Sequence, residues 1–201
     1  MIITRSGDAI RAVRRYNAAC STQPPEGMRK IVLKYGLIGG AILAGSMLLV
    51  MPFHEQIGFD KGMIIGYTSM VIAFLMIFFG VKSYRDNVAG GSVTFGRSLV
   101  VGLLIMLVAS VCYVIAWEIV YYLMLPDFAD QYTAYAMEKA RAAGATEAQL
   151  AAQLKEAEQF KEMYNNPLYN IAFTFLEPLP VGLLFSLVTA GVLSWGRKWT
   201  E

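Results

Sequence analysis

Four long apolar stretches divide this chain of 201 residues, and they constrain its fold more than any other feature. They cover residues 35–53, 62–81, 99–125 and 168–195. A helix needs about 20 apolar residues to cross the hydrocarbon core of a bilayer. Lipid admits only helices or closed barrels, and the alternation typical of barrel strands is absent. The sequence therefore predicts an all-α membrane protein whose four transmembrane helices form a bundle.

The composition excludes several other classes of protein. Hydrophobic residues make up 56% of the chain and charged residues only 16%, against about 45–50% and 25% in soluble domains. This balance argues against a disordered chain, a nucleic-acid-binding protein and a disulfide scaffold. The chain has one histidine, His54, and its cysteines, Cys20 and Cys112, lack metal-ligand spacing. We therefore expect no metal site, no cofactor and no Cys/His nucleophile.

The distribution of lysine and arginine predicts the orientation. Basic residues gather before the first stretch, between the second and third, and at the C-terminus: Arg5, Arg11, Arg14, Arg15, Arg29, Lys30, Lys34, Lys82, Arg85, Arg97, Arg197 and Lys198. The loop between the first two stretches holds only Lys61. The positive-inside rule then places both termini in the cytoplasm. We expect a multi-pass protein of the bacterial inner membrane, in contact with the lipid bilayer.

Residues 1–27 differ from the rest of the chain. The segment CSTQPPEG is typical of a linker, and Met28 precedes two basic residues, as a natural start would. We expect 1–27 to be a disordered tail, or the true start to be Met28. Residues 28–201 then form one four-span membrane domain.

The polar segment 126–167 has the pattern of a helical hairpin on the extracytoplasmic side. Gly144 is a suitable helix stop, and Thr146 with Gln149 fits a capping box that begins a second helix. A structured insert of about 40 residues is longer than a connector needs to be. It is a candidate surface for a protein partner.

Two carboxylates, Glu118 and Glu177, fall inside apolar stretches. A charge near the bilayer centre costs about 2.5–3.5 kcal/mol on insertion scales, so such residues suggest function. At 1.5 Å per residue both lie about 12–13 Å from the outer ends of their helices. We hypothesise a polar pocket centred on them, with further polar groups at the same level: Tyr67, Thr68, Ser69, Tyr121 and Tyr122.

A purely structural interpretation is favoured over this pocket. Pro178 and Pro180 should break the fourth helix, and Glu177 could cap the freed N–H groups of the restart. Glu118 could hydrogen-bond to a neighbouring helix. A broken helix at a binding site is also the pattern of transporters, so the carrier alternative stays open.

Small residues recur at four-residue steps in the first and fourth stretches: Gly36, Gly40 and Ala44, and Gly182, Ser186 and Ala190. Such ladders let helix backbones approach closely. We expect them to pack within the bundle, with a homodimer face as the alternative.

Several short motifs occur in a recognisable order: Gly66-Tyr67-Thr68-Ser69-Met70, Thr94-Phe95-Gly96-Arg97, Trp117-Glu118, and Glu177-Pro178-Leu179-Pro180-Val181-Gly182-Leu183. With them the chain resembles, over about Met28 to Lys198, a bacterial membrane family called domain of unknown function (DUF) 4199. The resemblance implies a four-span inner-membrane protein. It implies no activity and no catalytic residue.

The sequence favours a non-enzymatic accessory or scaffold protein that acts through the hairpin or a helix face. The alternative is a small carrier, or an ion- or proton-coupled unit, that uses Glu118 and Glu177. A membrane enzyme ranks third, because two carboxylates without a nucleophile–base pair are a thin basis for catalysis.

Overall fold

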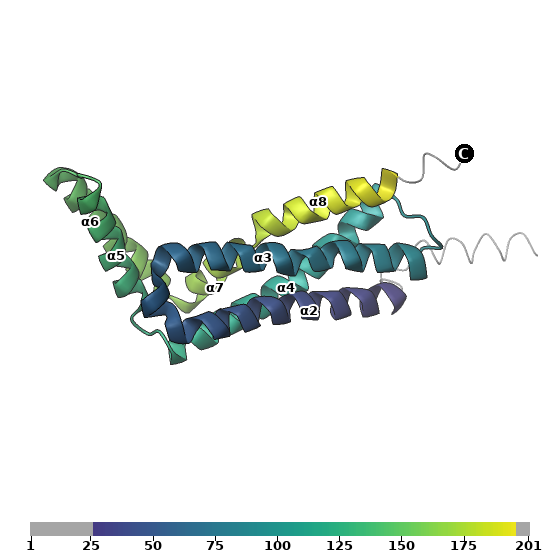
Figure 1. Ribbon diagram of the computed structural model, residues 1–201, viewed down its shortest axis with the longest axis horizontal. Helices are drawn as coiled ribbons and strands as arrows, with labels where there is room; N and C mark the ends of the chain where they lie inside the picture. The colour runs from purple at the N-terminus through teal and green to yellow at the C-terminus, as the bar shows by residue number, and fades with distance from the viewer. Residues whose placement is uncertain (1–25, 196–201) are drawn as a thin grey trace, which may run out of the picture.

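The computed structural model describes residues 26–195, and all regular elements in that range are helical. Four long helices run along the longest axis of the molecule (Figure 1): α2 (Glu26–Val50), α3 (His54–Asn87), α4 (Phe95–Leu123) and α8 (Leu179–Trp195). The shorter helices lie at or near one end: α5 (Phe128–Ala142), α6 (Glu147–Tyr164) and α7 (Pro167–Leu176). The predictions for residues 1–25 and for Arg197 and Lys198 fall outside the described residues, and Glu26 already belongs to α2.

Three helical stretches are long and apolar enough to cross a membrane: Glu26–Asn87, Phe95–Leu123 and Pro167–Trp195. The first stretch folds back on itself, so that α2 and α3 pack against each other. The reversal takes place at the 3₁₀ turn η1 (Met51–Phe53) and at Gly58, whose φ of 71° lies in the left-handed region that glycine tolerates. These stretches make the chain a helical multi-pass membrane protein by length and composition.

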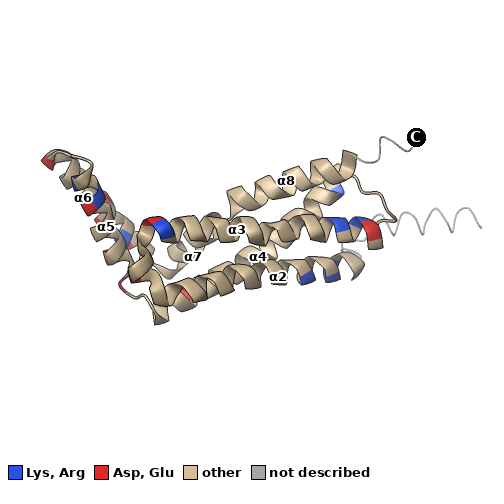
Figure 2. Cartoon of the chain, viewed as in Figure 1, with Lys and Arg blue, Asp and Glu red and all other residues tan. Residues whose placement is uncertain are grey.

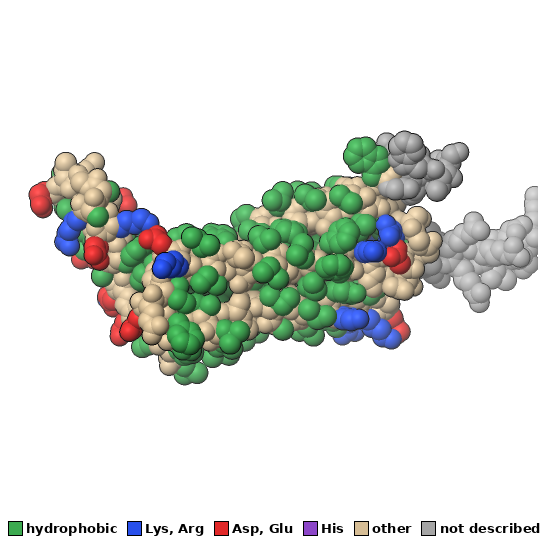
Figure 3. Space-filling view, in the orientation of Figure 1, with side chains coloured by type: hydrophobic (Ala, Val, Ile, Leu, Met, Phe, Trp, Pro, Cys, Tyr) green, Lys and Arg blue, Asp and Glu red, His purple; other side chains and the backbone are tan. Residues whose placement is uncertain are grey.

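The sides of the bundle are apolar. Figure 3 shows hydrophobic side chains along its length and charged side chains near its two ends. Large side chains such as Leu49 and Leu123 are 74% and 78% exposed. A soluble protein seldom exposes so extensive an apolar surface, whereas a bilayer covers it.

Two clusters of buried side chains hold the helices together. The larger one lies inside the bundle, where Phe74, Ile77 and Val81 of α3 belong to the same packed cluster as Val101 and Ile105 of α4. The smaller one lies toward the α5 end and combines aromatic with aliphatic side chains: Trp117, Val120, Tyr121, Leu125 and Tyr164. This smaller cluster joins α4 of the bundle to α6.

Helices α5 and α6 form a pair that leaves the end of the bundle at an angle (Figure 1). We call residues 128–164 the α5–α6 pair. The turn between them uses Gly144 at φ 81°. The capping box predicted from the sequence is confirmed: the Thr146 side chain accepts from the Gln149 N–H, and the Gln149 side chain accepts from the Thr146 N–H. Local sequence thus fixes where α6 begins.

Candidate functional site

A group of polar side chains lies where α4 meets α7. We call it the α4–α7 polar cluster, and its members are Tyr113, Trp117, Asn170, Thr174 and Glu177. The Tyr113 hydroxyl donates to Glu177 Oε2 at 2.9 Å. Trp117 Nε1 donates to Asn170 Oδ1 at 3.1 Å, and Thr174 Oγ1 donates to the same oxygen at 3.2 Å. The cluster therefore links the two helices through side-chain hydrogen bonds as well as apolar packing.

Asn170 is the most deeply placed member of the cluster. Its side chain is fully buried, and its Nδ2 has no hydrogen-bond partner among the described residues. The Oδ1 atom satisfies the donors of Trp117 and Thr174. A buried amide that accepts two hydrogen bonds orients both donors and disfavours any sliding of α7 along α4.

The chain interrupts its last apolar stretch at Glu177. α7 ends at Leu176, and α8 begins at Leu179 with Pro180 in its first turn. Pro178 is fully buried and cannot donate a backbone hydrogen bond. Glu177 directly follows α7, and its N–H donates the last hydrogen bond of that helix to the Phe173 carbonyl at 3.2 Å. The break therefore falls at the prolines, as the sequence predicts, and Glu177 stands at the elbow.

Glu118 lies on a different side of α4. Tyr113 faces α7, and five residues at 100° each place Glu118 about 140° away around the helix axis. Its neighbours one turn away, Ile115 and Tyr122, are 56% and 51% exposed. Glu118 Oε1 is nevertheless buried and has no hydrogen-bond partner within residues 26–195. The structure does not bring Glu118 and Glu177 together in one pocket.

Of the other residues predicted to line this pocket, one lies near the α4–α7 polar cluster and the others lie apart from it. Tyr121 reaches the region of the α4–α7 polar cluster, since its hydroxyl donates to Asn165 Oδ1 at 3.0 Å. Tyr122 is 51% exposed, and the Tyr121 ring is its one aromatic neighbour within residues 26–195. Thr68 and Ser69 donate to carbonyls of their own helix at 2.7 and 2.8 Å.

Tyr67 is 47% exposed, so its ring lies largely on the outer surface of α3.

Tyr113, Asn170 and Thr174 were not predicted from the sequence as members of this site. Each is a single polar residue in an apolar stretch, which is a usable signal, but a hydroxyl or amide is far less unusual there than a carboxylate.

The aromatic neighbour Tyr164 is also buried, and burial raises the pKa of its hydroxyl. That hydroxyl stays protonated at physiological pH, so it can act as a donor.

The predicted packing residues lie between helices of the bundle. Cβ atoms added at Gly36 and Gly40 would come within 2.6 Å of Val108 Cβ and 2.5 Å of Cys112 Cβ. A Cβ at Gly182 would meet the Met106 side chain, and Ser186 and Ala190 are fully buried.

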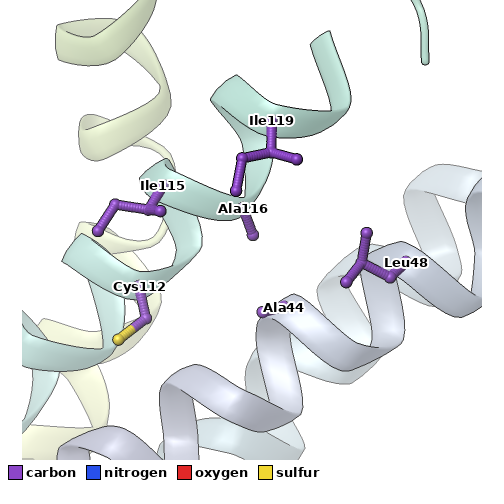
Figure 4. A pocket seen from close by; sticks show the side chains of 6 residues that line it. All are labelled: Ala44, Leu48, Cys112, Ile115, Ala116 and Ile119. Carbon is purple, nitrogen blue, oxygen red and sulfur yellow. The ribbon is translucent and has the colours of Figure 1, made fainter. Parts of the chain in front are cut away.

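Ala44 instead helps to line a small apolar hollow between α2 and α4 of about 270 Å³ (Figure 4). Its other lining side chains are Leu48, Cys112, Ile115, Ala116 and Ile119. With no polar side chain in its lining, the hollow offers nothing to orient a polar ligand.

A larger groove of about 580 Å³ lies along the α5–α6 pair and reaches Met63 of α3. Small and aromatic side chains line most of it, with Lys139, Gln153 and Glu156 as its charged and amide-bearing members. Other lining residues are Tyr132, Thr133, Tyr135, Ala136, Met137, Ala140, Ala143, Ala157 and Phe160. Small side chains along both helices leave room for an elongated apolar segment.

Two exposed ion pairs involve the α5–α6 pair, one with α3 and one between its own two helices. Lys139 Nζ lies 2.8 Å from Asp60 Oδ1 and thereby joins α5 to α3. The hydrogen bond to Asp60 raises the pKa of Lys139, and the hydrogen bond to Tyr135 adds to that effect. Lys161 of α6 pairs with Asp130 of α5, and this hydrogen bond raises the pKa of Lys161. Both ammonium groups stay charged across the physiological range.

Metal ligands do not gather in the part of the chain that the structure describes, where no three histidine, cysteine, aspartate or glutamate side chains form a group suited to an ion. The model of a family described as "Protein of unknown function (DUF4199)" matches residues 34–194. The chain belongs to the DUF4199 family. The resemblance carried by the short motifs is thereby confirmed, and the DUF4199 match includes the α4–α7 polar cluster and the α5–α6 pair. No curated protein and no solved structure matches the chain.

Proposed function

We propose that the chain crosses the inner membrane of a bacterium four times, as α2, α3, α4 and, in the last crossing, α7 followed by α8. The basic residues of the bundle support this arrangement, because all of them except Lys61 lie at the end remote from the α5–α6 pair (Figure 2). They are Arg29, Lys30, Lys34, Lys82, Arg85 and Arg97. The positive-inside rule assigns that end to the cytoplasm, and with it both termini. The α5–α6 pair then forms a helical hairpin on the extracytoplasmic side.

We further propose that the protein is a non-enzymatic accessory or scaffold protein that recruits a protein partner through the α5–α6 pair. The groove of about 580 Å³ on this pair is the observation that carries the proposal. Tyr164 is the only buried residue of α6, which is 18 residues long. A helix with so little burial gains little from its own chain, and a partner laid in the groove would cover it.

Site-specific photocrosslinking in native membranes tests this proposal. A photoreactive residue at Ala157 lies in the groove, whereas one at Ala151 lies on the opposite face of α6 and is the matched control. We expect a discrete crosslinked protein from Ala157 that Ala151 does not give. Equal crosslinking from both positions, or none from Ala157, would contradict a groove-specific partner.

A small ion- or proton-coupled carrier is the second candidate. The helix break at Pro178, beside the carboxylate of Glu177, favours it, because transporters bind substrates at broken helices. Glu118 and Tyr113, the hydrogen-bond partner of Glu177, lie on different sides of α4, which counts against a proton shared by the two glutamates. The carrier predicts that Glu118→Gln abolishes function while deletion of the α5–α6 pair does not, and the scaffold predicts the reverse.

A further inference from the structure

Glu177 presents a carboxylate on the outer surface of the bundle. The residue is exposed, and the bond from Tyr113 engages only its Oε2 atom. Glu177 lies at the break between α7 and α8. Within residues 26–195, no basic side chain forms an ion pair with it.

The exposed side chains near Glu177 are apolar, and Glu177 lies deep in the span. At 1.5 Å per residue it is about 15 Å from the start of α7 and about 27 Å from Trp195. Tyr113 is also about 15 Å from the end of α4, so both helices give the same depth. Leu176 and Leu184 nearby are 60% and 59% exposed. An exposed carboxylate at this level faces hydrocarbon unless another molecule covers it.

The covering group cannot be a cation from a second copy of the described helices. The lysines and arginines of residues 26–195 all lie near the ends of the bundle or in the α5–α6 pair: Arg29, Lys30, Lys34, Lys61, Lys82, Arg85, Arg97, Lys139, Arg141, Lys155 and Lys161. A parallel or antiparallel copy therefore offers none at the depth of Glu177. Within residues 26–195 a second copy supplies no positive charge at this depth, whereas a helix of a different membrane protein can supply one.

We propose that Glu177 is the recognition point for a transmembrane helix of another protein that carries a lysine or arginine at the same depth. The partner helix lies against the elbow between α7 and α8, and its cation pairs with the carboxylate that Tyr113 orients. Leu176 and Leu184 supply the apolar contact on either side. This inference rests on the proposed accessory role and adds a second, intramembrane contact to it.

A designed peptide measures this recognition without knowledge of the natural partner. The probe is a transmembrane helix of leucine and alanine with one lysine at the level of Glu177, and the control peptide has leucine there. Energy transfer reports association with the labelled full-length protein in phosphatidylcholine–phosphatidylglycerol vesicles. We expect the lysine peptide to associate roughly tenfold more tightly, in line with the strength of polar contacts between membrane helices.

Three comparisons decide the outcome. Glu177→Gln should remove the preference for lysine, whereas Glu118→Gln should keep it because the Glu177 carboxylate remains. Moving the lysine by two helical turns should remove the preference even with the unaltered protein, so the test survives if Glu177→Gln folds poorly. Equal binding of the lysine and leucine peptides, or a preference that persists in folded Glu177→Gln, would overturn the proposal. The peptide does not reach the α5–α6 pair, so this result is independent of the groove crosslinking.

Discussion

Gly40 shows how closely α2 approaches α4. A Cβ at this position would lie 2.5 Å from Cys112 Cβ and 2.8 Å from Cys112 Sγ, so one of the helices has to move. We expect Gly40→Ala to lower the free energy of unfolding by about 1–3 kcal/mol, the usual cost of overpacking. Gly45→Ala in the same helix is the control, because a Cβ there meets no atom within 4 Å. Thermal unfolding in detergent should separate the two variants, and equal midpoints would refute the close contact.

Asn170 supplies the buried acceptor for the Trp117 N–H. Replacing it with alanine leaves the Trp117 N–H without its acceptor in a buried place, which costs about 1–3 kcal/mol. We therefore expect Asn170→Ala to lower the unfolding midpoint and to change the environment-sensitive fluorescence of Trp117. Thr68→Val serves as control, because the Thr68 hydroxyl is exposed and bonds only within its own helix. If both variants unfold alike, the Trp117–Asn170 hydrogen bond has no measurable role.

At the scale of the helices, the contact between Lys139 and Asp60 ties α5 to α3. Both side chains are exposed, so we expect Lys139→Gln to leave global stability unchanged and to speed amide exchange in α5 several-fold. The pKa of Lys139 is raised above its ordinary 10.5, so the pair contributes fully below that pH and is lost only as pH rises through the higher folded value. Protection of α5 relative to Lys139→Gln should therefore be the same at pH 7 and pH 9. If the protection of α5 differed between pH 7 and pH 9, a group other than Lys139 would control it.

The helices also show what the sequence could predict. The helix break at Pro178, the Gly144 turn and the capping box at Thr146 follow from residues close together in the chain. The pairs Tyr113–Glu177 and Trp117–Asn170 join residues 64 and 53 positions apart. Their formation depends on how α4 is rotated about its own axis. Because α4 is apolar on all sides, periodicity could not fix that rotation, and Glu118 therefore could not be assigned to a face.

At the scale of the whole molecule, the decisive question is how often the chain crosses the bilayer. If α2, α3 and α4 each cross once and α7 with α8 makes the last crossing, the α5–α6 pair and the loop between α3 and α4 lie on opposite sides of the bilayer. Single cysteines at Ala148, on α6, and at Ser92, in that loop, probe this arrangement, since both positions are exposed. With Cys20 and Cys112 replaced, we expect an impermeant maleimide to label Ala148→Cys in intact cells and Ser92→Cys only after permeabilisation. Three crossings cannot give this pattern and also leave both termini in the cytoplasm, because an odd number of crossings separates the two ends of a chain. A reporter at the C-terminus, read together with one at the N-terminus, therefore distinguishes four crossings from three.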